Sequence, residues 1–156
     1  MLKYLSSNSI DSIVTSQNLS RLLGNSHVTV ENLLFAFITN KNTSISNLIK
    51  GMKIETDNNI CSEYIIKNLN KTSFYEVPFS KEVISSFKFA KAEWLEQQEF
   101  DWHPYIQSKY VLKAILLNYP ENISCTFKNL YCYKDKIIKT IDMSKKFIQL
   151  STLSAL

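Results

Sequence analysis

The chain has 156 residues, of which 45% are hydrophobic and 21% are charged; these values fit one globular domain with a hydrophobic core and exclude a disordered chain. Acidic and basic residues are interspersed, so the formal net charge of +4 forms no clustered basic patch of the kind that nucleic-acid-binding proteins carry. Only two glycines and three prolines occur, too few for the turns of a many-stranded sheet, and we predict an all-α fold.

Helical spacing of apolar residues predicts four helices in the first half. The first covers residues 7–23, and Gly24 can end it in a left-handed conformation. Thr29 can cap a second, strongly apolar helix over residues 30–38. Two shorter helices are expected at residues 44–50, with Gly51 placed to cap the end, and at about residues 56–69. The apolar positions of the first helix are Ile10, Ile13, Val14, Leu19, Leu22 and Leu23, and the small residues between them, which indicate close approach by another helix, are Ser9, Ser16 and Ser20.

The pattern resumes after residues 70–79, a segment that begins polar, contains Pro78 and is predicted to be a linker. Ser80 can cap a long helix, and an apolar helix is expected over residues 108–118. Two more helices are predicted at about residues 121–130 and 133–141. Residues 143–156 are a C-terminal tail, either a further amphipathic helix or a segment that frays.

The two halves repeat the same order of helices. Leu5-Ser6 aligns with Phe79-Ser80 at an offset of 74 residues, and residues 28–34 align with residues 106–112 at an offset of 78. The second half therefore carries a four-residue insertion near residues 99–103. We predict a single domain, residues 1–156, built from one repeat over about residues 4–69 and another over about residues 80–142.

Each half resembles one repeat of the Clp/Hsp100 N-terminal domain, a double four-helix module that precedes the ATPase rings of these unfoldases. In the first repeat, Gly24, Glu31 and Leu34 match the family pattern in register. The second repeat departs from it, because Lys109 replaces the acid and Gln98 replaces the glycine; the residues that fit there are Ser80, Tyr105, Ser108, Leu112 and Ala114. The resemblance implies two pseudo-symmetric four-helix repeats. The alternative is a generic helical bundle whose amphipathic helices look alike.

The resemblance also implies a candidate ligand site. In some bacterial members the acid of the motif and the threonine that begins the repeat bind phosphoarginine; the matching residues here are Glu31 and Ser6 in the first repeat. The second repeat would offer Lys109 and Ser80, and a lysine cannot bind a guanidinium group. At most one such site is expected. The structural alternative is that Glu31 is simply favoured by the dipole at the start of its helix.

The insertion places aromatic residues in a polar loop that contains a proline. Phe100, Trp102 and Tyr105 are our candidate anchors for a protein partner, because aromatic side chains on a fixed loop often dominate protein interfaces. The alternative is that Trp102 folds back to cover the core.

No catalytic chemistry is predicted. With Gly24 and Gly51 as its only glycines, the chain has no phosphate-binding GxxxxGK[ST] loop. His103, Cys125 and Cys132 lack zinc-site spacing and a clear fourth ligand, so we expect no metal and no cofactor.

The resemblance implies a non-catalytic accessory or adaptor subunit of a Clp chaperone–protease, with the Clp ATPase, the Clp protease core and protein substrates as partners. The alternative is a helical scaffold or assembly factor unrelated to Clp. No secretory signal or apolar stretch of membrane-spanning length is evident. The abundance of Asn, Lys and Ile suits an AT-rich genome and leads us to expect the plastid stroma, with a bacterial cytoplasm as the alternative.

Overall fold

The computed structural model describes residues 2–56, 77–100 and 102–143. Every regular element in these residues is helical, which confirms the all-α prediction. No helix among them is long and apolar enough to cross a membrane. The elements are η1 (Leu2–Tyr4), α1 (Ser7–Leu22), α2 (Val30–Thr39), α3 (Ser44–Gly51), α5 (Lys81–Gln97), α6 (Ser108–Asn118), η2 (Pro120–Ile123) and α7 (Lys128–Cys132), and residues 134–143 form a last helix. The fourth predicted helix, most of the predicted linker and nearly all of the predicted tail lie outside the described residues.

Side-chain caps explain why several helices begin where the sequence predicts. The side chain of Ser6 accepts a hydrogen bond from the third residue of α1, and Ser80 does the same for α5. Thr29 and Asn32 form a reciprocal capping box at the start of α2. Such caps satisfy backbone N–H groups that have no partner within the helix. Gly24 has φ of 67° and ends α1 in the left-handed conformation, as predicted.

Two predictions about helix ends are wrong. Gly51 is the last residue of α3, and Lys53, with φ of 55°, takes the left-handed conformation in its place. The predicted helix over residues 121–130 is split into η2 and α7, because the backbone at Phe127 leaves the helical region (φ −122°, ψ 61°). That break turns the Phe127 side chain into the core, where it is buried.

Helix α1 packs against α2 through a face of serines. The hydroxyl of Ser20 donates to Asn32 at 2.9 Å, and the Asn40 side chain donates to Ser12 at 3.1 Å. These bonds join opposite ends of the two helices, so the helices are antiparallel and Ser16, midway along α1, lies opposite Ala36. The buried small residues confirm the predicted close approach. Of the apolar residues at helical spacing in α1, Ile10, Val14 and Leu22 are exposed and lie outside the core.

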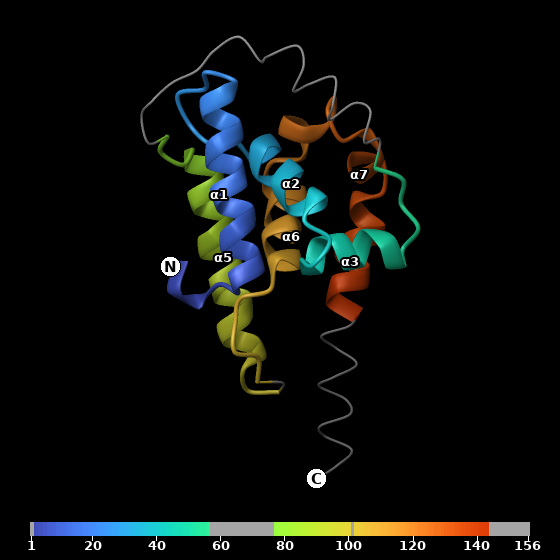
Figure 1. Ribbon diagram of the computed structural model, residues 1–156. Coiled ribbons are helices and arrows are strands. Elements are labelled where there is room, and N and C mark those ends of the chain that lie inside the picture. The colour runs from blue at the N-terminus through green and yellow to red at the C-terminus, as the bar shows by residue number, and fades with distance from the viewer. Residues whose placement is uncertain (1, 57–76, 101, 144–156) are drawn as a thin grey trace.

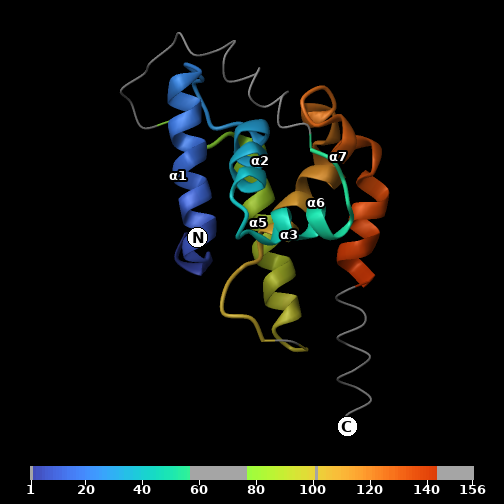
Figure 2. The ribbon, with the colours of Figure 1, turned by 45° about the vertical axis from the view of Figure 1, so that its right-hand side comes forward.

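The second repeat is built in the same way, with α5 packed against α6. At the offset of 74 residues, Ser12 and Ser16 of α1 correspond to Ser86 and Ala90 of α5, and all four are buried. Small residues at these positions let the long helix approach the apolar helix closely in both repeats. The two central helices, α2 and α6, lie between α1 on one side and α7 on the other (Figures 1 and 2).

Two short backbone contacts join the repeats and reveal their symmetry. Leu5 pairs with Ile106, and Val28 pairs with Phe79. Leu5 and Phe79 are equivalent in the two repeats, as are Val28 and Ile106, so the second contact is the first with the repeats exchanged. Likewise α3 packs on α6, while η2 packs on α2. A pseudo-twofold axis between the repeats produces this exchange. The two contacts confirm the alignment of the repeats that was taken from the sequence.

Candidate protein-binding site

The segment between α5 and α6 is held in place by hydrogen bonds to the backbone of one residue, His103. The side-chain oxygen of Gln98 accepts from the His103 N–H at 2.7 Å, and the Gln98 amide donates to the His103 carbonyl at 2.8 Å. The indole N–H of Trp94 donates to the same carbonyl at 2.8 Å. We call these three bonds the His103 clamp. They fix the far end of the insertion against the last turn of α5.

The clamp explains a departure from the family pattern. Gln98 stands where the first repeat has Gly24, and its φ of −58° lies in the right-handed helical region. It therefore does not end its helix as Gly24 does; its side chain anchors the longer loop instead. The sequence shows that the glycine is replaced by Gln98. It does not predict the bonds between Gln98 and His103, because these residues meet only once the loop has folded.

The clamped loop exposes aromatic and apolar side chains. Trp102 is 72% exposed and Tyr105 is 45% exposed, and Leu95 in the last turns of α5 is 54% exposed. Trp102 therefore does not cover the core. Phe100 is half-buried, and its N–H donates to the Gln97 carbonyl at 3.0 Å. This end of α5 and its loop extend past the other described helices (Figures 1 and 2). Of the three predicted aromatic anchors, Trp102 and Tyr105 are available to a partner.

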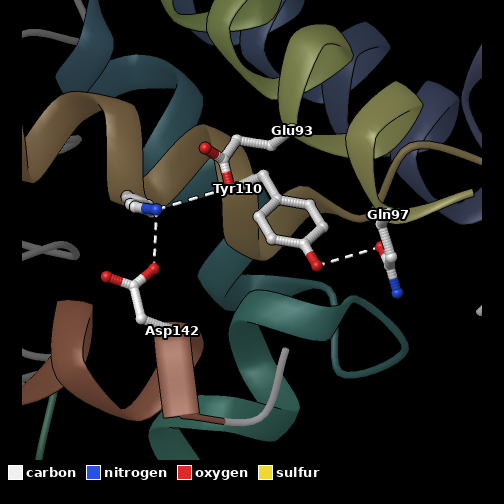
Figure 3. Close-up of polar contacts among 5 residues, drawn as sticks. Glu93, Gln97, Tyr110 and Asp142 are labelled. Atoms are coloured by element: carbon white, nitrogen blue, oxygen red, sulfur yellow. Dashed lines mark hydrogen bonds and ion pairs between the residues drawn. The ribbon is translucent and has the colours of Figure 1, made fainter. Parts of the chain in front are cut away.

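Buried polar contacts brace the base of this loop. The hydroxyl of Tyr110 in α6 donates to the side-chain oxygen of Gln97 at 2.9 Å, and both residues are buried (Figure 3). Tyr110 is equivalent to Asn32 at the offset of 78 residues. Each repeat therefore uses the same buried position of its apolar helix to bond back to its long helix.

A second contact in this region involves a buried cation. The Lys113 ammonium group lies 2.6 Å from Asp142 and 3.4 Å from Glu93, and so joins α6 to α5 and to the last helix (Figure 3). Burial alone would lower the pKa of Lys113. The hydrogen bond to Asp142 and the negative charges of Glu93 and Asp142 outweigh that effect and raise the pKa above its usual value. The lysine is charged at neutral pH.

Ser6 and Glu31, the other predicted site residues, do not line one hollow. Ser6 caps α1 and lines a hollow of about 240 Å³ that also includes Tyr105 and Ser108. The Glu31 carboxylate accepts a hydrogen bond from Thr126 at 2.5 Å, in the turn between η2 and α7. The pseudo-twofold arrangement explains the separation, because the start of each repeat lies beside the second helix of the other.

Ser80 and Lys109, the positions equivalent to Ser6 and Glu31, also lie against the other repeat. Ser80 lines a second hollow, of about 380 Å³, together with Thr29 of the first repeat. The backbone N–H of Lys109 donates to the hydroxyl of Ser44 at 2.8 Å. Ser6 and Glu31 therefore contact the other repeat rather than each other, and Glu31 serves as a contact between repeats. Phosphoarginine binding stays an implication of the resemblance.

The candidate zinc ligands do not form a cluster. Among the described residues, no group of three His, Cys, Asp or Glu side chains is placed to hold a metal ion. Cys125 and Cys132 are exposed thiols.

No protein-family model matches the chain, and no curated protein matches its sequence. Solved structures do match its fold. The Hsp104 N-terminal domain from Candida albicans is 18% identical with a TM-score of 0.57, and the match covers 96% of this chain and 89% of that one. The N-terminal domain of the caseinolytic protease associated chaperone ClpD from Arabidopsis thaliana is 14% identical with a TM-score of 0.53, over 99% of this chain and 96% of that one.

A third structure comes from work on a malarial protein secretion system. It is 17% identical to this chain with a TM-score of 0.63, and the match covers 91% of this chain and 94% of that one. Nearly full coverage in both directions shows that the overall fold is shared over most of each chain. The chain therefore has the fold of the Clp/Hsp100 N-terminal domains, which is the fold that the resemblance of its two halves to that family implied.

Proposed function

We propose that this chain is a non-catalytic, protein-binding accessory or adaptor subunit of a Clp chaperone–protease system. It docks on the Clp ATPase or the protease core, or presents protein substrates to them. The single observation that carries this proposal is the Clp N-terminal fold over nearly the whole chain, including its likeness to the N-terminal domain of a chaperone associated with a caseinolytic protease.

The clamped, exposed loop supports a binding role. Large aromatic side chains often dominate the binding energy of protein interfaces. Trp102 and Tyr105 are exposed aromatic side chains on either side of the clamped His103 backbone. The Asn-, Lys- and Ile-rich composition and the plant ClpD neighbour support the plastid stroma as the site of action, with a bacterial cytoplasm as the alternative.

A co-elution experiment tests the proposal. The purified chain is mixed with the Clp ATPase and, separately, with the Clp protease core of its own source, and each mixture is run by size exclusion with and without ATP at low and moderate salt. We expect the chain to shift to the volume of one of these rings. If it elutes alone under all conditions, it is not a Clp subunit, and the alternative of a helical scaffold or assembly factor unrelated to Clp takes its place.

A further inference from the structure

The sequence around the exposed loop differs in charge from the rest of the chain. Residues 92–108 contain four of the 14 acidic residues and none of the 18 lysines and arginines, although the whole chain carries a net charge of +4. Glu93 is turned inward to Lys113. Glu96 and Glu99 are exposed. The end of α5 and its loop therefore form an acidic segment, bordered by Lys91 and Lys109, on a basic protein.

Exposed apolar side chains occupy the same region. Leu95, Trp102 and Tyr105 are each about half exposed or more, and they come from the last turns of α5 and its clamped loop. We call these three residues, together with Glu99, the acidic aromatic tip. Its two kinds of group favour the same partner, because aromatic faces and carboxylates both attract lysine and arginine, while leucine favours apolar contact.

We propose that the acidic aromatic tip binds a protein segment that carries arginine or lysine beside apolar side chains. This rests on the proposed function and adds to it the chemistry of the partner. The charge of the tip is complementary to such a segment and repels nucleic acids and anionic membrane surfaces. The His103 clamp fixes the backbone next to Trp102, and Glu99 attracts the cationic segment to it.

Binding of a defined peptide tests this inference. The probe is a fluorescein-labelled, Gly/Ser-rich peptide that carries arginines and leucines, and its control has citrulline, a neutral analogue, at each arginine. Fluorescence anisotropy of the label reports binding to the full chain. We expect the arginine peptide to bind at low salt and to weaken as salt rises, and the citrulline peptide to bind much more weakly.

Variants locate the contact on the tip. Trp102→Ala is expected to weaken binding of the arginine peptide by roughly tenfold or more, and Glu99→Gln by roughly threefold. The matched control Asp11→Asn neutralises an exposed acid on α1 and should leave binding unchanged. Circular dichroism checks that all variants keep the helical content of the wild type.

Each contrary outcome overturns the inference. The proposal is wrong if the arginine peptide does not bind, if the citrulline peptide binds equally well, or if Trp102→Ala binds as well as the wild type. It is also wrong if sedimentation shows that the wild type self-associates through Trp102, since the occupant is then a second copy of this basic chain. A chain that fails these tests but still co-elutes with a Clp ring keeps its proposed function and binds by another chemistry.

Discussion

Replacing Asn32 by alanine is expected to lower the free energy of unfolding by about 3 kcal/mol. The side-chain oxygen of Asn32 accepts three hydrogen bonds: from the Ser20 hydroxyl at 2.9 Å, the Asn25 amide at 3.0 Å and the Thr29 N–H at 3.2 Å. Asn32 is completely buried, so these donors cannot all find water when the oxygen is removed. Urea denaturation followed by circular dichroism measures the loss.

The matched control for this variant is Asn25→Ala. It removes one donor from the edge of the same group and leaves the other two bonds to Asn32 in place, so we expect a loss of about 1 kcal/mol or less. Equal losses in the two variants, or a loss below about 1 kcal/mol for Asn32→Ala, would contradict the role of Asn32 as the buried acceptor that joins α1 to α2.

Replacing Ser16 by leucine should destabilise the protein by about 3 kcal/mol, although leucine is the better helix former. Ser16 is completely buried and lies opposite Ala36, where α1 and α2 approach closely. A leucine side chain has no space there and must separate the two helices or adopt a strained rotamer. The shift in thermal midpoint relative to the wild type measures the effect.

Two controls show whether lack of space is the cause. Ser16→Ala removes only a hydroxyl that bonds within its own helix, to the Ile13 carbonyl at 2.7 Å, and should change stability by less than about 1 kcal/mol. Val14→Leu enlarges a side chain that is 52% exposed and should be nearly neutral. If Ser16→Leu proves neutral or stabilising, the packing of α1 on α2 is looser than described.

Local signals in the sequence predicted where α1, α2 and α5 begin. Capping residues such as Ser6, Thr29 and Ser80 act within three residues of their own position, so their effect does not depend on the rest of the fold. The repeat could also be predicted, because equivalent positions keep similar residues on both sides of the pseudo-twofold axis. Ser16 and Ala90 are one such pair.

The faces of α1 could not be predicted from apolar spacing. Ile10 and Val14 fit a helical apolar stripe, but the close packing of α2 selects the serine face, and small size there outweighs hydrophobicity. Exposure of Trp102 was one of the two alternatives for the loop and is what the structure shows, whereas binding of a partner at this site stays a prediction. The His103 clamp could not be foreseen, because its bonds depend on the folded path of the insertion.

The separation of Ser6 from Glu31 is another feature that could not be predicted from the sequence. Motifs within one repeat were expected to meet, whereas the pseudo-twofold axis brings each repeat's first cap beside the other repeat's second helix. Sequence alignment of the halves gives the equivalent positions but not which copies lie together.

Deleting residues 99–102 tests most directly whether this Clp N-terminal fold binds its partner through the loop. The starts of α5 and α6 are 27 residues apart and those of α1 and α2 are 23 apart, so the deletion gives the second repeat the spacing of the first. We expect the deleted chain to keep its helical content and to lose at least roughly tenfold in affinity for the Clp ring that the wild type is proposed to bind. The control Val14→Ala, which trims an exposed side chain on α1, should bind as the wild type does. A folded deletion variant that binds the ring with unchanged affinity would contradict this account.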